Sequence, residues 1–187
     1  KNDAVEKALD DLAVFRPLIL AGVCKEKTMA EIYDDVSEAI NDMGYTNCHA
    51  KYPQGVLGHK VGKIPTGLIP RIPFMRFELS TFLYLGAEEL SRFLNPWDNH
   101  TALWSDYTRV SADPGLWAVE PHIGMAHGGA SVSGAKDGAK APTMAHGGAA
   151  VFGVKWEEIL HVTENDAYYL DDNLPHVNRW QERGVAI

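Results

Sequence analysis

Three side chains that can bind a metal ion stand in short motifs along the chain: His59, Glu120 and Glu157. His59 lies in the sequence GHKVG, Glu120 in WAVEP and Glu157 in GVKWEE. One imidazole and two carboxylates can coordinate a divalent metal ion at neutral pH. These residue types predict a metal site if successive strands bring them together.

Each of these residues also has a simpler interpretation. A single histidine is most often structural, although the glycines that flank His59 permit an unusually close approach of the backbone. Glu120 follows an apolar strand, where a carboxylate is costly to bury unless it is paired or binds a metal. The alternative for Glu120 is therefore a salt bridge to Lys or Arg. Strand alternation sends one of Glu157 and Glu158 inward and the other outward.

The elements that precede these motifs are predicted to be two helices within the first 45 residues. Asn2 or Asp3 can cap the first helix, and residues 21–23 predict its end. Thr28 and Glu31 have the spacing of a capping box at the start of the second helix, and Gly44 supplies its C-terminal stop.

The rest of the chain is predicted to be mainly strands and loops. Prolines and glycines exclude a long helix from residues 46–73. Apolar and β-branched residues predict strands at 116–123, 151–163 and 167–170, with the second strand nearly continuous. The composition also predicts a strand at 77–85 and a helix at 86–94, and an irregular tail at 171–180 that packs its tryptophan.

Residues 124–150 have a composition unlike that of a globular core. They are rich in Gly, Ala and Ser, and the hexapeptide MAHGGA occurs in them twice. Such a segment buries too little apolar surface to offset its chain entropy. We therefore expect a flexible insertion, or a local duplication, within a single domain that spans residues 1–187. Its repeated histidines, His127 and His146, are weak candidates for metal ligands because they lie far apart on a glycine-rich loop.

Composition excludes several classes of function. A net charge of −8, with 17 scattered Lys and Arg residues, argues against a nucleic-acid partner. No run of 18 apolar residues is present, so no membrane partner is expected. Two cysteines, Cys24 and Cys48, cannot form a disulfide framework and favour a reducing, cytoplasmic location. The chain begins at Lys1 without a methionine or a signal-like segment, which is typical of an internal or processed fragment.

The ordered motifs resemble the C-terminal half of the pita-bread metallopeptidases, the family of methionine aminopeptidases, Xaa-Pro dipeptidases and creatinase. The sequence GHKVG at 58–62 resembles the family segment T-G-H-G-I-G, and EPHI at 120–123 resembles E-P-G-I/L-Y. GVKWEE at 153–158 resembles G-V-R-I-E-D. The chain departs from these patterns at Lys60, His122 and Lys155, where the family has a small residue, a glycine and an arginine.

The resemblance implies an α+β pita-bread (creatinase/aminopeptidase-like) fold that lacks its N-terminal part. It implies that His59, Glu120 and Glu157 bind one or two divalent ions of manganese, cobalt or zinc. It further implies a hydrolase that cleaves an amide or peptide bond in a peptide or small amide, as an Xaa-Pro peptidase does. Glu120 would also act as the catalytic base that takes a proton from water. The resemblance assigns no substrate-binding residue.

Two aspartate ligands of the family have no counterpart ahead of these motifs. Residues 105–109, SDYTR, resemble one aspartate motif in letters but lie between His59 and Glu120, in the wrong order. A second copy of the chain in a homodimer, or a partner chain or segment, would have to supply the missing donors. The alternatives to an enzyme are a non-catalytic pita-bread module that binds peptides or proteins, and an inactive fragment.

Overall fold

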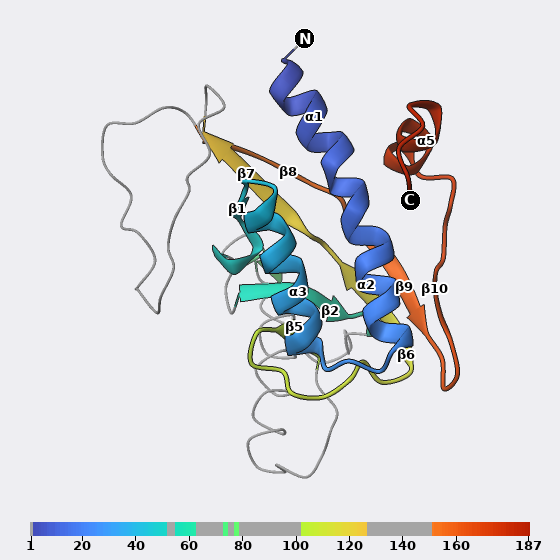
Figure 1. Cartoon of the computed structure of the whole chain (residues 1–187). Coiled ribbons are helices and arrows are strands. Elements are labelled where there is room, and N and C mark those ends of the chain that lie inside the picture. Colours follow the sequence, from blue (N-terminus) through green and yellow to red (C-terminus); the bar gives the residue numbers. More distant parts are fainter. Residues whose placement is uncertain (1, 52–54, 63–72, 75–76, 79–101, 127–150) are drawn as a thin grey trace.

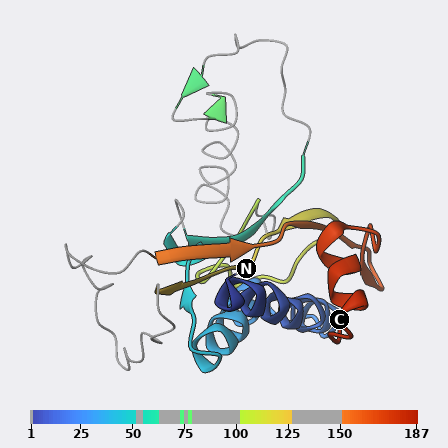
Figure 2. The ribbon, with the colours of Figure 1, turned by 90° about the horizontal axis from the view of Figure 1, so that it is seen from above.

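The computed structural model describes residues 2–51, 55–62, 73–74, 77–78, 102–126 and 151–187. In these residues helices and antiparallel strands form an α+β arrangement, in which the N-terminal helices cover one face of the strands (Figures 1 and 2). None of the helices in these residues is long and apolar enough to span a membrane.

The first two helices, α1 (Asp3–Asp11) and α2 (Phe15–Cys24), are joined by a single 3₁₀ turn, Leu12–Val14. The expected cap is confirmed, because the Asn2 side chain accepts a hydrogen bond from the backbone N–H of Ala4. The expected helix end at residues 21–23 is wrong, since α2 continues through them. Gly22 instead permits close packing between helices, because a Cβ there would lie 2.7 Å from Cγ1 of Ile32.

The third helix, α3 (Met29–Asp42), begins at the predicted capping box. The Thr28 hydroxyl accepts the Glu31 N–H at 3.2 Å, and the Glu31 carboxylate accepts the Thr28 N–H at 2.8 Å. Gly44 follows the helix with a φ of 78°, as expected of a glycine stop. The apolar stripe of α3 is fully buried and consists of Met29, Ala30, Ile32, Val36 and Ile40.

The strands form two main antiparallel sheets in the described part of the chain. The larger sheet has the order β10 (Ala167–Tyr169), β9 (Glu158–Val162), β6 (Gly115–Val119), β2 (Val56–Lys60) and β5 (Leu103–Ser105). The smaller sheet contains β1 (Thr46–Asn47), β7 (His122–Ala126) and β8 (Val151–Lys155). A separate pair is formed by β3 (Pro73–Phe74) and β4 (Phe77–Glu78).

Two of the predicted strands are each divided in two. The segment expected as one strand at 116–123 forms β6 and β7, and the segment at 151–163 forms β8 and β9. Both interruptions lie at the same level, because β6 pairs with β9 and β7 pairs with β8. Pro121 lacks the N–H that an unbroken ladder needs, which accounts for the break on its strand. The result is one long ribbon with an interruption beside Glu120 and Glu157.

The C-terminal tail was predicted to be irregular, and this is wrong for its second half. Pro175 begins a helix, α5 (Pro175–Glu182), whose Trp180 is buried as expected. The Trp180 indole donates to the carbonyl of Leu9 in α1 at 2.8 Å, so the helix is fixed by a contact distant in sequence. The predictions for residues 79–94 and for 127–150 of the insertion lie outside the described residues. The first residues of that insertion, 124–126, belong to β7.

Candidate functional site

The three candidate residues lie in or directly beside three adjacent strands of the larger sheet, β2, β6 and β9. His59 is in β2, Glu120 directly follows β6, and Glu157 directly precedes β9. His59 faces Ala118 in the β2–β6 register. Since Val119 faces Glu158, the next pair along the ribbon is Glu120 and Glu157.

This register places the three candidate side chains on one face of the sheet. Residues that face each other on antiparallel strands share a face, and so do residues two apart on one strand. Ala118 therefore shares its face with both His59 and Glu120. The opposite face carries Val119, which is fully buried, and Glu158, which contacts α2. The candidate site consequently lies on the face directed away from the helices.

Glu120 and Glu157 both interact with one lysine. The Lys155 ammonium lies 2.7 Å from Oε2 of Glu120 and 3.7 Å from Oε2 of Glu157. The Glu120 side chain is 14% exposed, whereas those of Glu157 and Lys155 are 53% and 41% exposed. The salt bridge that was the alternative interpretation of Glu120 is therefore present. It also shows that the two carboxylates can share a single cation.

His59 lies farther along the same face and is half-buried. Its Nδ1 lies 3.4 Å from the carbonyl oxygen of Lys60 in its own strand. The close approach expected at the neighbouring glycine is present, because a Cβ on Gly58 would lie 2.4 Å from the carbonyl oxygen of Ala118. Within the described ranges, no three His, Cys, Asp or Glu residues form a group that could hold a metal ion.

Strand alternation predicted that one of Glu157 and Glu158 faces inward. In the structure this residue is Glu158. Its side chain is 1% exposed. Its Oε1 lies 2.9 Å from Nε2 of His176 in α5, and its Oε2 accepts a hydrogen bond from Nε of Arg16 in α2 at 3.1 Å. The Arg16 guanidinium also lies over the Tyr169 ring, 4.4 Å from its centroid. These contacts bind α2, β9 and α5 together.

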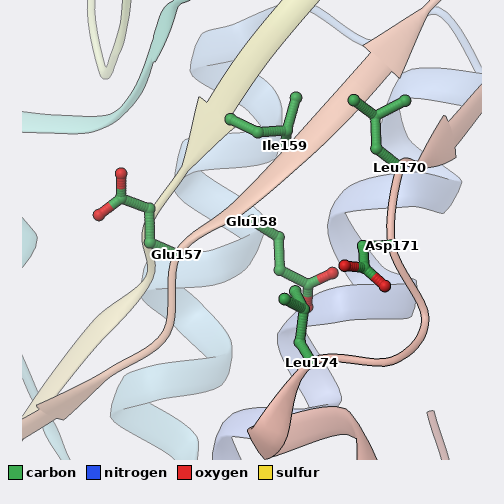
Figure 3. A pocket seen from close by; sticks show the side chains of 6 residues that line it. All are labelled: Glu157, Glu158, Ile159, Leu170, Asp171 and Leu174. Carbon is green, nitrogen blue, oxygen red and sulfur yellow. The ribbon is translucent and has the colours of Figure 1, made fainter.

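A pocket of about 460 Å³ lies between β9 and the segment that leads into α5 (Figure 3). Figure 3 shows the Glu157 side chain pointing away from that of Glu158, which points towards Asp171 and Leu174. The Glu158 carboxylate in this pocket is already bound by Arg16 and His176. The pocket is lined by Glu157, Glu158, Ile159, Leu170, Asp171 and Leu174.

Two histidines next to the ribbon, His49 and His122, were not predicted as site residues. His122 faces Lys155 across β7 and β8, and its backbone N–H lies 3.5 Å from Nδ1 of His49. Burial lowers the pKa of His122, and the Lys155 charge lowers it further, while Glu120 opposes the change. His49 is fully buried, and burial together with the nearby His122 lowers its pKa to about 4. The replacement of a family glycine by His122 was the only signal of this pair in the sequence.

The segment with the sequence SDYTR, residues 105–109, has a structural role in the described fold. The hydroxyls of Ser105 and Thr108 are 3.0 Å apart, and Thr108 donates to the carbonyl of Leu103. The Thr108 carbonyl accepts the N–H of Ala30 at the start of α3. Both hydroxyl residues are buried. Their contacts fix the turn after β5 against the start of α3.

Comparison of the chain with protein-family models, with curated proteins and with solved structures finds no significant match.

Proposed function

We propose that the chain belongs to a metal-dependent hydrolase of pita-bread type that cleaves an amide or peptide bond, with Xaa-Pro peptides as the first substrates to test. The observation that carries this proposal is the position of Glu120 and Glu157. Glu120 directly follows β6 and Glu157 directly precedes its neighbour β9, and both lie within 3.7 Å of one cationic atom. The resemblance of the three motifs to the family supports the same conclusion.

The types of the donor residues suit a divalent cation, although within the described residues the side chains do not stand as a group of three that could hold one. Two carboxylates share one face with an imidazole from the neighbouring strand, and such oxygen and nitrogen donors suit manganese, cobalt or zinc. His59, Glu120 and Glu157 would hold the ion. It would supply Lewis acidity, which polarises a carbonyl and lowers the pKa of water. Donors from a partner chain, from a second copy or from another segment would complete a site for two ions.

The chain's own groups have distinct tasks in this proposal. Glu120 is largely shielded from solvent, and its carboxylate accepts a hydrogen bond from Lys155. The same carboxylate can take a proton from an attacking water. Glu158, on the other face, is occupied by Arg16 and His176, so its task is to hold the ribbon in place. We also propose a cytoplasmic location, in which the free thiols of Cys24 and Cys48 stay reduced.

The test is hydrolysis of Xaa-Pro dipeptides in the presence of manganese, cobalt or zinc. We expect metal-dependent hydrolysis that falls at least about 100-fold in Glu120→Gln, because the substitution removes both a ligand and a base. Glu164→Gln, which changes an exposed carboxylate in the β9–β10 turn, is the matched control and should keep its activity. Absence of hydrolysis with every metal, or equal rates in wild type and Glu120→Gln, would contradict the proposal.

A metal-free module that binds peptides is the second candidate, and the Lys155 ion pair favours it. An ammonium already neutralises the carboxylates that the family uses for metal. In this case calorimetry with an Xaa-Pro peptide in the presence of a chelator would show binding. Binding that requires added metal would contradict the module.

A further inference from the structure

We propose that the pocket between β9 and residues 170–174 binds the arginine side chain of a peptide. The aliphatic stem of the arginine packs against the apolar part of the lining, and its guanidinium reaches the carboxylates of Asp171 and Glu158. This inference goes beyond the proposed hydrolysis, because it requires neither a metal ion nor cleavage. It also names a ligand class for the peptide-binding alternative.

The pocket forms where two neighbouring strands diverge. β10 ends at Tyr169, which faces Leu160, and the Leu170 N–H donates to the carbonyl of Ile159 at 3.0 Å. Beyond this bond the chain leaves the sheet and enters α5 at Pro175. The space that opens beside the start of β9 has a volume of about 460 Å³ (Figure 3). This lies within the range of about 300–1,000 Å³ that is typical of ligand pockets.

Half of the residues that line the pocket are apolar: Ile159, Leu170 and Leu174. Leu170 is 51% exposed, the largest exposed fraction of any large apolar side chain in the described residues. A long cationic side chain can cover such a surface with its stem while its charged end stays close to water. The apolar part of the lining therefore suits the stem of an arginine.

The other three lining residues all carry carboxylates, and they are Glu157, Glu158 and Asp171. The guanidinium of Arg16 pairs with both Glu158 and Asp172, so one positive charge faces two negative ones. Asp171 accepts the N–H of Asn173 at 2.8 Å but forms no ion pair with any described residue. The pocket therefore keeps an excess of negative charge, which is complementary to a cationic occupant.

The buried carboxylate of Glu158 favours a guanidinium over an ammonium. Its side chain is 1% exposed and points towards Asp171 (Figure 3). A carboxylate has about four acceptor positions, and Arg16 and His176 use three of them within the described residues. One position on Oε2 remains for a further donor. A guanidinium has several N–H donors in one plane and can bond two carboxylates at once, whereas an ammonium is a compact, strongly hydrated charge.

Both sides of the pocket are fixed before a ligand binds. On the α5 side, Arg179 donates to Asp10 of α1 at 2.9 Å, and the Asn178 amide donates to Oδ1 of Asn173 at 3.0 Å. On the β9 side, the ion pair with Arg16 holds Glu158 in place. Binding therefore needs little ordering of the protein, which lowers its entropic cost.

The first test is an NMR titration of the ¹⁵N-labelled wild-type chain with acetyl-Ala-Arg-Ala-amide in the presence of EDTA. We expect saturable shifts of the amide signals of Ile159, Leu170 and Asp171. A matched peptide with citrulline has nearly the same shape without the charge, and it should bind at least about fivefold more weakly. A matched lysine peptide should bind at least about twofold more weakly, because it lacks the planar donors.

The second test repeats the titration with variants of the pocket. Asp171→Asn keeps the Oδ1 acceptor for Asn173 but loses the charge, and it should bind the arginine peptide at least about threefold more weakly. Leu170→Ala should also weaken binding, because it removes apolar surface that the stem covers. Glu164→Gln is the matched control, since it removes an equal charge from the exposed turn between β9 and β10 and should leave the affinity unchanged.

The outcomes separate this inference from the proposed hydrolysis. Equal affinity for the arginine and citrulline peptides would overturn the inference, and so would shifts outside the pocket or equal losses in Asp171→Asn and Glu164→Gln. A lysine peptide that binds as tightly would overturn the choice of arginine. If no peptide gives saturable shifts, the pocket is not a binding site, and the proposed hydrolysis still stands on its own test with Glu120→Gln.

Discussion

Arg16 and Glu158 are 142 residues apart in the chain, yet the guanidinium Nε of Arg16 lies 3.1 Å from Oε2 of Glu158. Their side chains are 11% and 1% exposed. The pair connects α2 to the start of β9, directly beside Glu157. The position of the candidate site therefore depends on a buried ion pair on the opposite face of the sheet.

Loss of the Glu158 charge should destabilise the fold. In Glu158→Gln the largely buried Arg16 guanidinium keeps only its ion pair with the exposed Asp172, and the loss of the buried carboxylate costs about 3 kcal/mol. Urea unfolding monitored by circular dichroism measures the difference in the free energy of unfolding. Glu157→Gln is the matched control, because its side chain is 53% exposed and should change stability by less than about 1 kcal/mol. Equal effects of the two substitutions would contradict this assignment.

Stability should fall as the pH is lowered, because of His49. Its pKa is about 4 in the folded chain against an ordinary value of 6.5, so between these values the unfolded chain binds more protons. The folded state then loses stability as pH falls from 6.5 to 4, by about 2 kcal/mol at pH 5. Urea unfolding at pH 7 and pH 5 should show a smaller loss in His49→Gln than in wild type. Parallel losses in the two proteins would show that His49 does not titrate in this way.

Gly58 should tolerate no side chain. A Cβ at this position would lie 2.4 Å from the backbone oxygen of Ala118, so β2 and β6 would have to separate. We expect Gly58→Ala to reduce the free energy of unfolding by about 2 kcal/mol or more. Gly22→Ala provides the comparison, because its closest contact is the Ile32 side chain at 2.7 Å, which can move more easily than a backbone. A larger loss in Gly22→Ala than in Gly58→Ala would contradict this reasoning.

Local signals in the sequence predicted the structure best. The hydroxyl of Thr28 and the carboxylate of Glu31 are three residues apart, so their capping box needs no distant partner, and it is confirmed. Gly22 was misinterpreted as a helix end, because the reason for that glycine is the Ile32 side chain on another helix. Helix α5 was missed for the same reason, since Trp180 is fixed by a carbonyl in α1.

The sequence named the residues of the candidate site, but it did not indicate their contacts. Strand alternation correctly separated one member of the Glu157–Glu158 pair from the other. The sequence also offered a salt bridge as an alternative for Glu120, and it is present. Lys155 could not be chosen as the partner, because only the pairing of β7 with β8 and of β6 with β9 brings it beside Glu120. Such a register depends on the whole ribbon rather than on any short motif.

The central claim is that Glu120 and Glu157 bind a divalent metal ion, and metal content tests it most directly. Wild type, Glu120→Gln, Glu157→Gln and the control Glu164→Gln would each be dialysed against manganese, cobalt or zinc and then against metal-free buffer. Elemental mass spectrometry would count the ions that remain. We predict at least one ion per chain in wild type and Glu164→Gln, and loss of that ion in the other two variants. A chain that retains no metal, or retains the same amount in all four proteins, would contradict the claim.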